Sequence, residues 1–66
     1  MAAKYDIDVS PMDGNAFSIL SSVKVALKKI NVPDNLIGEY FDEATRGDYD
    51  NLLKVSSDWV NLKLDL

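Results

Sequence analysis

The side chains that could carry chemistry in this chain are carboxylates, hydroxyls and lysines, because it contains no His and no Cys. Acid–base catalysis most often uses His, and a nucleophilic Ser needs a base to activate it. The sequence also has no G-x-x-x-x-G-K loop and no G-x-G-x-x-G turn that could hold phosphates. The chain is therefore predicted to be neither an enzyme nor a cofactor-binding protein.

Pairs of carboxylates are the remaining candidates for a metal site. They are Asp6/Asp8, Asp42/Glu43 and Asp48/Asp50. Asp6 and Asp8 would share one face of a strand and could bind a hard cation, but a solvated strand face explains them equally well. The stretch that starts at Asp48 lacks the glycine and the final Glu of a calcium loop. No metal site is predicted.

Charge is unevenly distributed along the 66 residues, whose net charge is −4. Between Gly14 and Pro33 there are three lysines and no acid, whereas six acids and a single Arg46 lie between Asp34 and Asp50. Helix dipoles and solvated faces can explain this segregation. The alternative is an acidic surface that docks on a basic partner. The net charge argues against nucleic-acid binding, which depends on neutralising phosphates.

The elements that would position these groups follow from hydrophobic periodicity. Apolar residues alternate with polar ones over 4–10 and again over 61–66, which predicts two strands. Three- and four-residue spacing predicts helices over about 15–30, 34–46 and 49–60. Phe17 and Val25 lie off the main apolar stripe of the first helix, so each is either flanking core or exposed. Asp13 or Asn15 could cap the start of that helix.

These elements predict one small α+β domain over residues 1–66, with the order β-α-α-α-β and a three-helix core. The two terminal strands should pair, because a lone strand cannot satisfy its backbone groups. We expect an antiparallel sheet, since this register sets Lys4 against Asp65 and Asp6 against Lys63.

Three positions within the second half carry specific expectations. Gly47 should close a helix in the left-handed conformation, and Asp48 should cap the next one. Gly38 marks either a close helix crossing or a tolerated weakness inside a helix. Trp59 is expected in the core, whereas Tyr40 and Tyr49 are expected to be partly exposed.

Three stretches carry a resemblance to other proteins: Gly14–Leu20 (GNAFSIL), Glu43–Leu53 (EATRGDYDNLL) and Trp59–Val60. Together they resemble a group of short, uncharacterised proteins of bacteria and their phages. The resemblance implies a prokaryotic or phage setting and a stand-alone small domain. It assigns no role to any residue.

With catalysis set aside, a binding function remains. The sequence predicts a cytoplasmic protein-binding module of a bacterium or an infected host, which would modulate or inhibit a host protein through its acidic segment. The candidate contact residues are Glu39, Asp42, Glu43, Tyr49 and Asp50. The alternative is a self-associating structural protein, a homodimer through edge strands with no separate ligand. No apolar run approaches the roughly 20 residues that span a bilayer.

Overall fold

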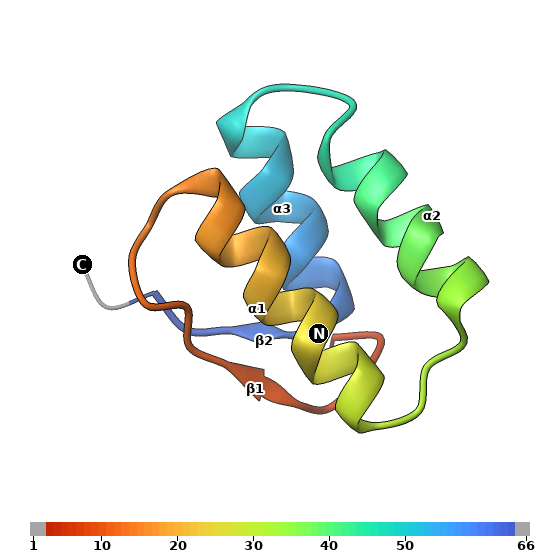
Figure 1. Ribbon diagram of the computed structural model, residues 1–66. Coiled ribbons are helices and arrows are strands. Elements are labelled where there is room, and N and C mark those ends of the chain that lie inside the picture. Colours follow the sequence, from red (N-terminus) through yellow and green to blue (C-terminus); the bar gives the residue numbers. More distant parts are fainter. Residues whose placement is uncertain (1–2, 65–66) are drawn as a thin grey trace.

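Three helices lie between two short strands in the computed structural model, which describes residues 3–64 (Figure 1). The elements are β1 (Asp8–Val9), α1 (Ala16–Lys29), α2 (Asp34–Ala44), α3 (Tyr49–Trp59) and β2 (Asn61–Leu62). The predicted order β-α-α-α-β is confirmed. Both strands are shorter than predicted, and the part of the second predicted strand at 65–66 lies outside the described residues. No helix within residues 3–64 is both long enough and apolar enough to cross a bilayer.

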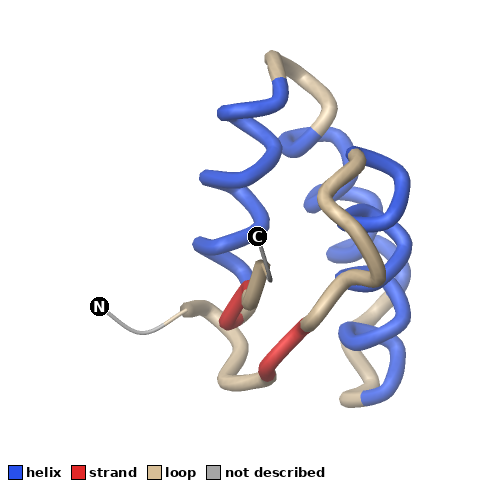
Figure 2. Tube along the Cα trace, turned by 90° about the vertical axis from the view of Figure 1, so that its left-hand side faces the viewer, coloured by secondary structure: helices blue, strands red, loops and turns tan. Residues whose placement is uncertain are grey.

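The helices alternate in direction: α1 and α3 run the same way, and α2 runs in the opposite direction at the side of the bundle (Figure 1). Figure 2 shows both strands at the end of the bundle where α1 and α3 finish. From β1, residues 10–15 rise to the opposite end of the bundle, where α1 begins (Figure 2). The chain therefore enters α1 at one end of the bundle and leaves α3 at the other end.

The two strands pair in parallel, so the predicted antiparallel sheet is wrong. Asp8 lies opposite Asn61 and Val9 opposite Leu62. The amide of Asn61 donates to the Ile7 carbonyl at 2.9 Å, and the amide of Lys63 donates to the Val9 carbonyl at 2.8 Å. The direction follows from the path of the chain, because α3 delivers β2 beside the start of β1. Two exposed charge pairs, worth at most about 1 kcal/mol each, cannot overturn that arrangement.

Of the two charge pairs on which the antiparallel prediction rested, Lys4–Asp65 lies partly outside the described residues, and Asp6 and Lys63 do not form an ion pair. The Asp6 carboxylate accepts a hydrogen bond from the side-chain amide of Asn61 at 3.0 Å instead of facing Lys63. The backbone of Lys4 donates to the Asp58 carbonyl at 2.8 Å, and that of Tyr5 donates to the Trp59 carbonyl at 2.9 Å. These two bonds satisfy carbonyls that the last turn of α3 would otherwise leave without partners.

The core lies where the three helices and the sheet meet. Its buried apolar side chains are Val9, Ile19, Val23, Ala26, Leu27, Val32, Ile37, Tyr40, Ala44, Leu52, Trp59 and Val60. The expectation for Trp59 is confirmed, and its ring lies 5.6 Å from that of Tyr40 in an edge-to-face arrangement. The expectation that Tyr40 would be partly exposed is wrong, because its side chain is fully buried. At the two ends of α1, Ala16 and the cap residue Ile30 are exposed although both are apolar.

The first helix ends through a left-handed residue, Asn31, with φ of 64°. The amide of Asn31 donates to the Lys28 carbonyl and that of Val32 donates to the Leu27 carbonyl, both at 3.0 Å. This is the hydrogen-bond pattern of a Schellman motif, with Asn taking the place usually held by Gly. Val32 is thereby folded back into the core beside Leu27.

The joint between α2 and α3 is partly as predicted. The Asp48 carboxylate accepts the amide of Asn51 at 3.0 Å, which confirms it as the cap of α3. Gly47 does not have a positive φ, so the left-handed prediction is wrong. A Cβ at Gly47 would instead lie 3.0 Å from the Cβ of Asn51. Glycine is favoured there by the tight contact with Asn51 and not by backbone conformation.

Candidate protein-binding surface

Several of the groups that could have carried chemistry instead hold the fold together. The Ser56 hydroxyl is buried and bonded to the Tyr40 hydroxyl at 2.6 Å. Asn15 caps α1 by accepting the Ser18 amide at 2.9 Å, while Asp13 accepts the Asn15 amide just before it. The latter bond is the main reason that the pKa of Asp13 lies below its usual value. Within residues 3–64 there is no group of three potential metal ligands.

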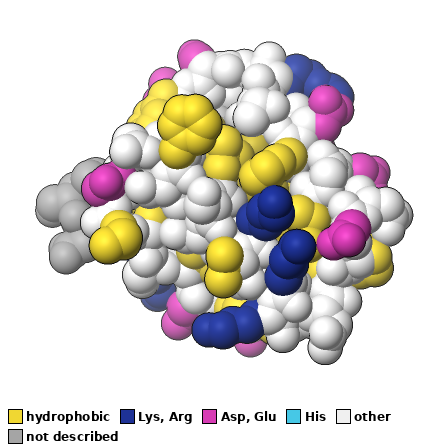
Figure 3. Space-filling model, in the orientation of Figure 1, with side chains coloured by type: hydrophobic (Ala, Val, Ile, Leu, Met, Phe, Trp, Pro, Cys, Tyr) yellow, Lys and Arg dark blue, Asp and Glu magenta, His cyan; other side chains and the backbone are white. Residues whose placement is uncertain are grey.

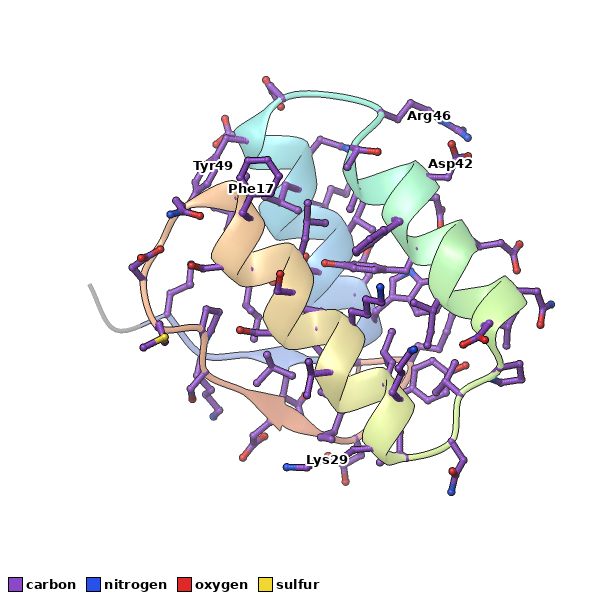
Figure 4. All side chains as sticks on the ribbon, in the orientation of Figure 1. Phe17, Lys29, Asp42, Arg46 and Tyr49 are labelled. Atoms are coloured by element: carbon purple, nitrogen blue, oxygen red, sulfur yellow. The ribbon has the colours of Figure 1, made fainter. Side chains whose placement is uncertain are left out.

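The acidic candidates are all exposed, but only Asp50 lies beside Tyr49, in the first turn of α3. Glu39, Asp42 and Glu43 lie on α2, and Asp42 forms an ion pair with Arg46 one turn further on. Figure 4 shows this pair at the C-terminal end of α2, whereas Tyr49 lies across the bundle beside Phe17. An ion pair this exposed contributes at most about 1 kcal/mol to folding.

Tyr49 instead belongs to a groove at the end of the bundle where α1 and α3 begin. Its hydroxyl donates to the Gly14 carbonyl and so ties the start of α3 to the residues that precede α1. The groove has a volume of about 350 Å³ and is mostly apolar. Its lining residues are Ala16, Phe17, Leu20, Ala44, Thr45, Gly47, Asp48, Tyr49 and Leu52. Two stretches that are far apart in the sequence, 14–20 and 43–53, therefore meet here.

Phe17 forms the rim of this groove and is the most exposed aromatic residue described. Its side chain is 82% exposed, compared with 43% for Tyr49. Phe17 is also the first residue of an exposed stripe on α1. Ser21 and Val25 follow it at four-residue steps on the solvent side of the helix. Val25 is 60% exposed. The sequence left Phe17 and Val25 open between flanking core and solvent, and the structure places both in solvent.

Lysines surround the C-terminal half of this stripe. We call the exposed residues Phe17, Ser21, Lys24, Val25, Lys28 and Lys29 the α1 outer face. Basic side chains and hydrophobic ones gather over this helix in Figure 3, while most acidic ones lie towards the periphery of that view. The Lys24 ammonium lies 5.7 Å from the Phe41 ring, an exposed cation–π contact. None of the three lysines forms an ion pair with a residue in the range 3–64.

Met12 extends the apolar surface beside α1. It is 98% exposed and lines a shallow depression together with Phe17, Ser18, Ser21 and Ser22. Large exposed apolar patches mark interaction sites, whereas single exposed apolar side chains need no explanation. Sequence reasoning missed this surface because it searched for charge. The off-stripe positions of Phe17 and Val25 were the signal that could have found it.

Comparison with known proteins adds no relative to this description. The chain matches no family model, no curated protein and no solved structure. The resemblance to short bacterial and phage proteins therefore stays a prediction, and functional inference has to start from the surface itself.

Proposed function

We propose that this protein is a small, non-enzymatic protein-binding module whose contact surface is the α1 outer face with the adjoining groove. The observation that supports this proposal is the exposure of Phe17 at the rim of an apolar groove. An aromatic residue in this position stabilises the isolated domain very little. It becomes useful when a partner covers it.

The free energy gained by burying Phe17 and Val25 supports this choice of surface. Covering a Phe or Val side chain is worth about 1.5–3 kcal/mol, so Phe17 and Val25 together could supply a substantial part of the free energy of a complex. Interface hot spots are typically aromatic residues set in apolar surroundings, and Tyr49, which also lines the groove, has the same character. Exposed carboxylates mainly influence the rate and the specificity of association.

The acidic residues Glu39, Asp42, Glu43 and Asp50 are a second candidate contact surface for the same function. They are exposed, and Asp50 directly follows Tyr49. A partner seated in the groove could therefore reach Asp50, whereas the acids of α2 would need a partner that wraps around the α2–α3 joint. In this proposal a basic partner is steered by the acids and held by the apolar residues.

Two sets of variants separate the two surfaces. The first, Phe17→Ser with Val25→Ser, removes apolar area, and the second, Asp42→Lys with Glu43→Lys and Asp50→Lys, reverses the acidic charge. Proteins captured from a bacterial lysate by the wild type should be identified by mass spectrometry, purified and titrated against each variant. We expect the first set to abolish binding and the second to weaken it in a salt-dependent manner.

Circular dichroism should show unchanged helical content in both sets, because every substituted side chain is exposed or lies outside the core. Undiminished binding by the Phe17→Ser/Val25→Ser variant would reject the α1 outer face. Loss of binding only in the charge-reversed variant would transfer the function to the acidic residues.

A further inference from the structure

We infer that Asp13 and Gly14 form a site of spontaneous aspartate isomerisation, a covalent modification that reroutes the main chain through the Asp13 side chain. This inference goes beyond the proposed function and does not depend on it. The reaction requires an aspartate, an unhindered amide on the next residue and a segment that can change conformation. The structure combines all three at this position.

The reaction consumes nothing except a proton and water. The Gly14 nitrogen attacks the carboxyl carbon of Asp13, so that a C–N bond forms and a C–O bond breaks. The departing oxygen takes up the amide proton and a proton from solvent and leaves as water. Water then reopens the resulting succinimide ring at either carbonyl. One opening restores aspartate, and the other gives isoaspartate, in which the former main-chain carboxyl is free.

The glycine that follows Asp13 distinguishes it from the other aspartates. Every other aspartate within residues 3–64 is followed by a residue that has a Cβ, and the residues after Asp6 and Asp8 are β-branched. A Cβ beside the attacking nitrogen hinders its approach, whereas glycine allows close approach. Asp13 is therefore the position in this range where ring closure meets the least steric resistance.

The Gly14 amide is also free to react. Among the hydrogen bonds formed within residues 3–64, none has the Gly14 N–H as its donor. By contrast, the amide that follows Asp6 donates to the Tyr5 carbonyl at 2.9 Å. The amide that follows Asp50 lies inside α3 and donates to the Asp48 carboxylate at 3.0 Å. Attack by either of those nitrogens would break a bond that holds the fold.

The two reacting groups lie in an exposed turn. Asp13 is exposed, and residues 10–15 belong to neither a helix nor a strand. The Asp13 carboxylate accepts the Asn15 amide at 2.9 Å, and the ring that this bond closes contains the Gly14 nitrogen. The carboxyl carbon and the nitrogen are thus kept within one turn, and rotations inside this turn bring them together.

Isomerisation would alter the groove that Tyr49 lines. The Gly14 carbonyl accepts the Tyr49 hydroxyl, and the next residue, Asn15, caps α1. Isoaspartate adds a methylene to the main chain directly before these groups, so the bond from Tyr49 and the support of the Asn15 amide are both disturbed. We expect the modified chain, separated by reversed-phase chromatography, to unfold at a lower temperature than the unmodified chain.

Prolonged incubation of the purified protein at physiological temperature and neutral pH tests this inference. An isoaspartyl-specific carboxyl methyltransferase with labelled S-adenosylmethionine quantifies isoaspartate, and electron-transfer fragmentation of the tryptic peptide locates it. We expect accumulation at residue 13, with Asp6 and Asp8 in the same tryptic peptide as internal controls. Asp13→Glu should abolish the signal, because a longer side chain would have to close a larger ring.

A second variant and an unfolded reference complete the test. Gly14 has no positive φ, so alanine can adopt its conformation, and Gly14→Ala should slow the reaction about tenfold by hindering the nitrogen. The same chain unfolded in guanidinium chloride gives the rate without the fold. Because exposed loops are mobile, the folded rate should lie within about tenfold of that reference. A larger reduction would show that the fold protects Asp13 and would overturn the inference, as would methyl transfer that persists in Asp13→Glu or equal accumulation at Asp6 or Asp8.

Discussion

The hydroxyl of Tyr40 on α2 lies 2.6 Å from that of Ser56 on α3, and both side chains are fully buried. The bond allows a tyrosine to occupy the centre of the core, since it satisfies a polar group that would otherwise be costly to bury. Across the described residues, no buried side-chain nitrogen or oxygen lacks a partner. The pair therefore fixes how α2 and α3 face each other.

Removing one member of this pair should cost more than removing both. Tyr40→Phe leaves the Ser56 hydroxyl buried without a side-chain partner, so we expect a loss of about 1–3 kcal/mol in the free energy of unfolding. Adding Ser56→Ala should recover much of that loss. Urea denaturation of the two single variants and the double variant gives the coupling energy. Strict additivity would show that the hydroxyls do not interact in solution.

Alkaline pH should destabilise the protein through the same tyrosine. Burial raises the pKa of Tyr40 above its usual value of 10.0, although the bond from Ser56 opposes this. The unfolded chain therefore releases the phenolic proton at a lower pH than the folded chain does, and stability falls as pH rises above about 10. Urea midpoints measured between pH 8 and 11 should decline more steeply for the wild type than for Tyr40→Phe/Ser56→Ala. Parallel curves would contradict this assignment.

Replacing glycine with alanine should have opposite effects at two positions. A Cβ at Gly38 meets nothing within 4 Å, so Gly38→Ala should stabilise α2 by about 1 kcal/mol. A Cβ at Gly47 would press on Asn51, whose side-chain amide is held by the Glu43 carbonyl at 2.9 Å. Gly47→Ala should therefore destabilise the fold, and Gly47→Val should do so more strongly. Thermal unfolding of the three variants should show a higher midpoint for the Gly38 variant and lower midpoints for the two Gly47 variants.

The cap of α3 should be worth a measurable fraction of the stability. Asp48→Ala removes the acceptor of the Asn51 amide, and the expected cost is about 0.5–2 kcal/mol. Asp50→Ala is the matched control, because Asp50 is an exposed acid in the same turn that does not cap the helix. Equal stability of the two variants in urea would show that the cap contributes nothing.

Local patterns in the sequence predicted the helices well, because each is specified within a few residues. Asn15 and Asp48 cap their helices, and the predicted bounds of 34–46 and 49–60 differ from the observed ones by one or two residues. The direction of strand pairing was missed because it depends on where three successive helices place β2 relative to β1. The burial of Tyr40 was missed for a similar reason, since its partner Ser56 belongs to another helix.

The candidate site was the least predictable part. Tyr49 was selected from the sequence, but its neighbour Phe17 could not be placed, because helical periodicity alone does not separate a core edge from solvent. The groove between them exists only after residues 14–20 and 43–53 meet. The uneven distribution of charge is visible in the sequence itself, so the predicted binding surface was placed on the acidic residues of α2.

The pairing of the two chain ends has a consequence for the order of folding. The side chains of Asp6 and Asn61 bond across 55 positions in the sequence, and residues 4 and 5 complete the last turn of α3. Contacts so distant in sequence close late, because they require loop closure over nearly the whole chain. On a ribosome these contacts cannot form until residues 58–63 have emerged from the exit tunnel. The helices can therefore assemble early, whereas residues 4–9 have to wait for β2 to be released.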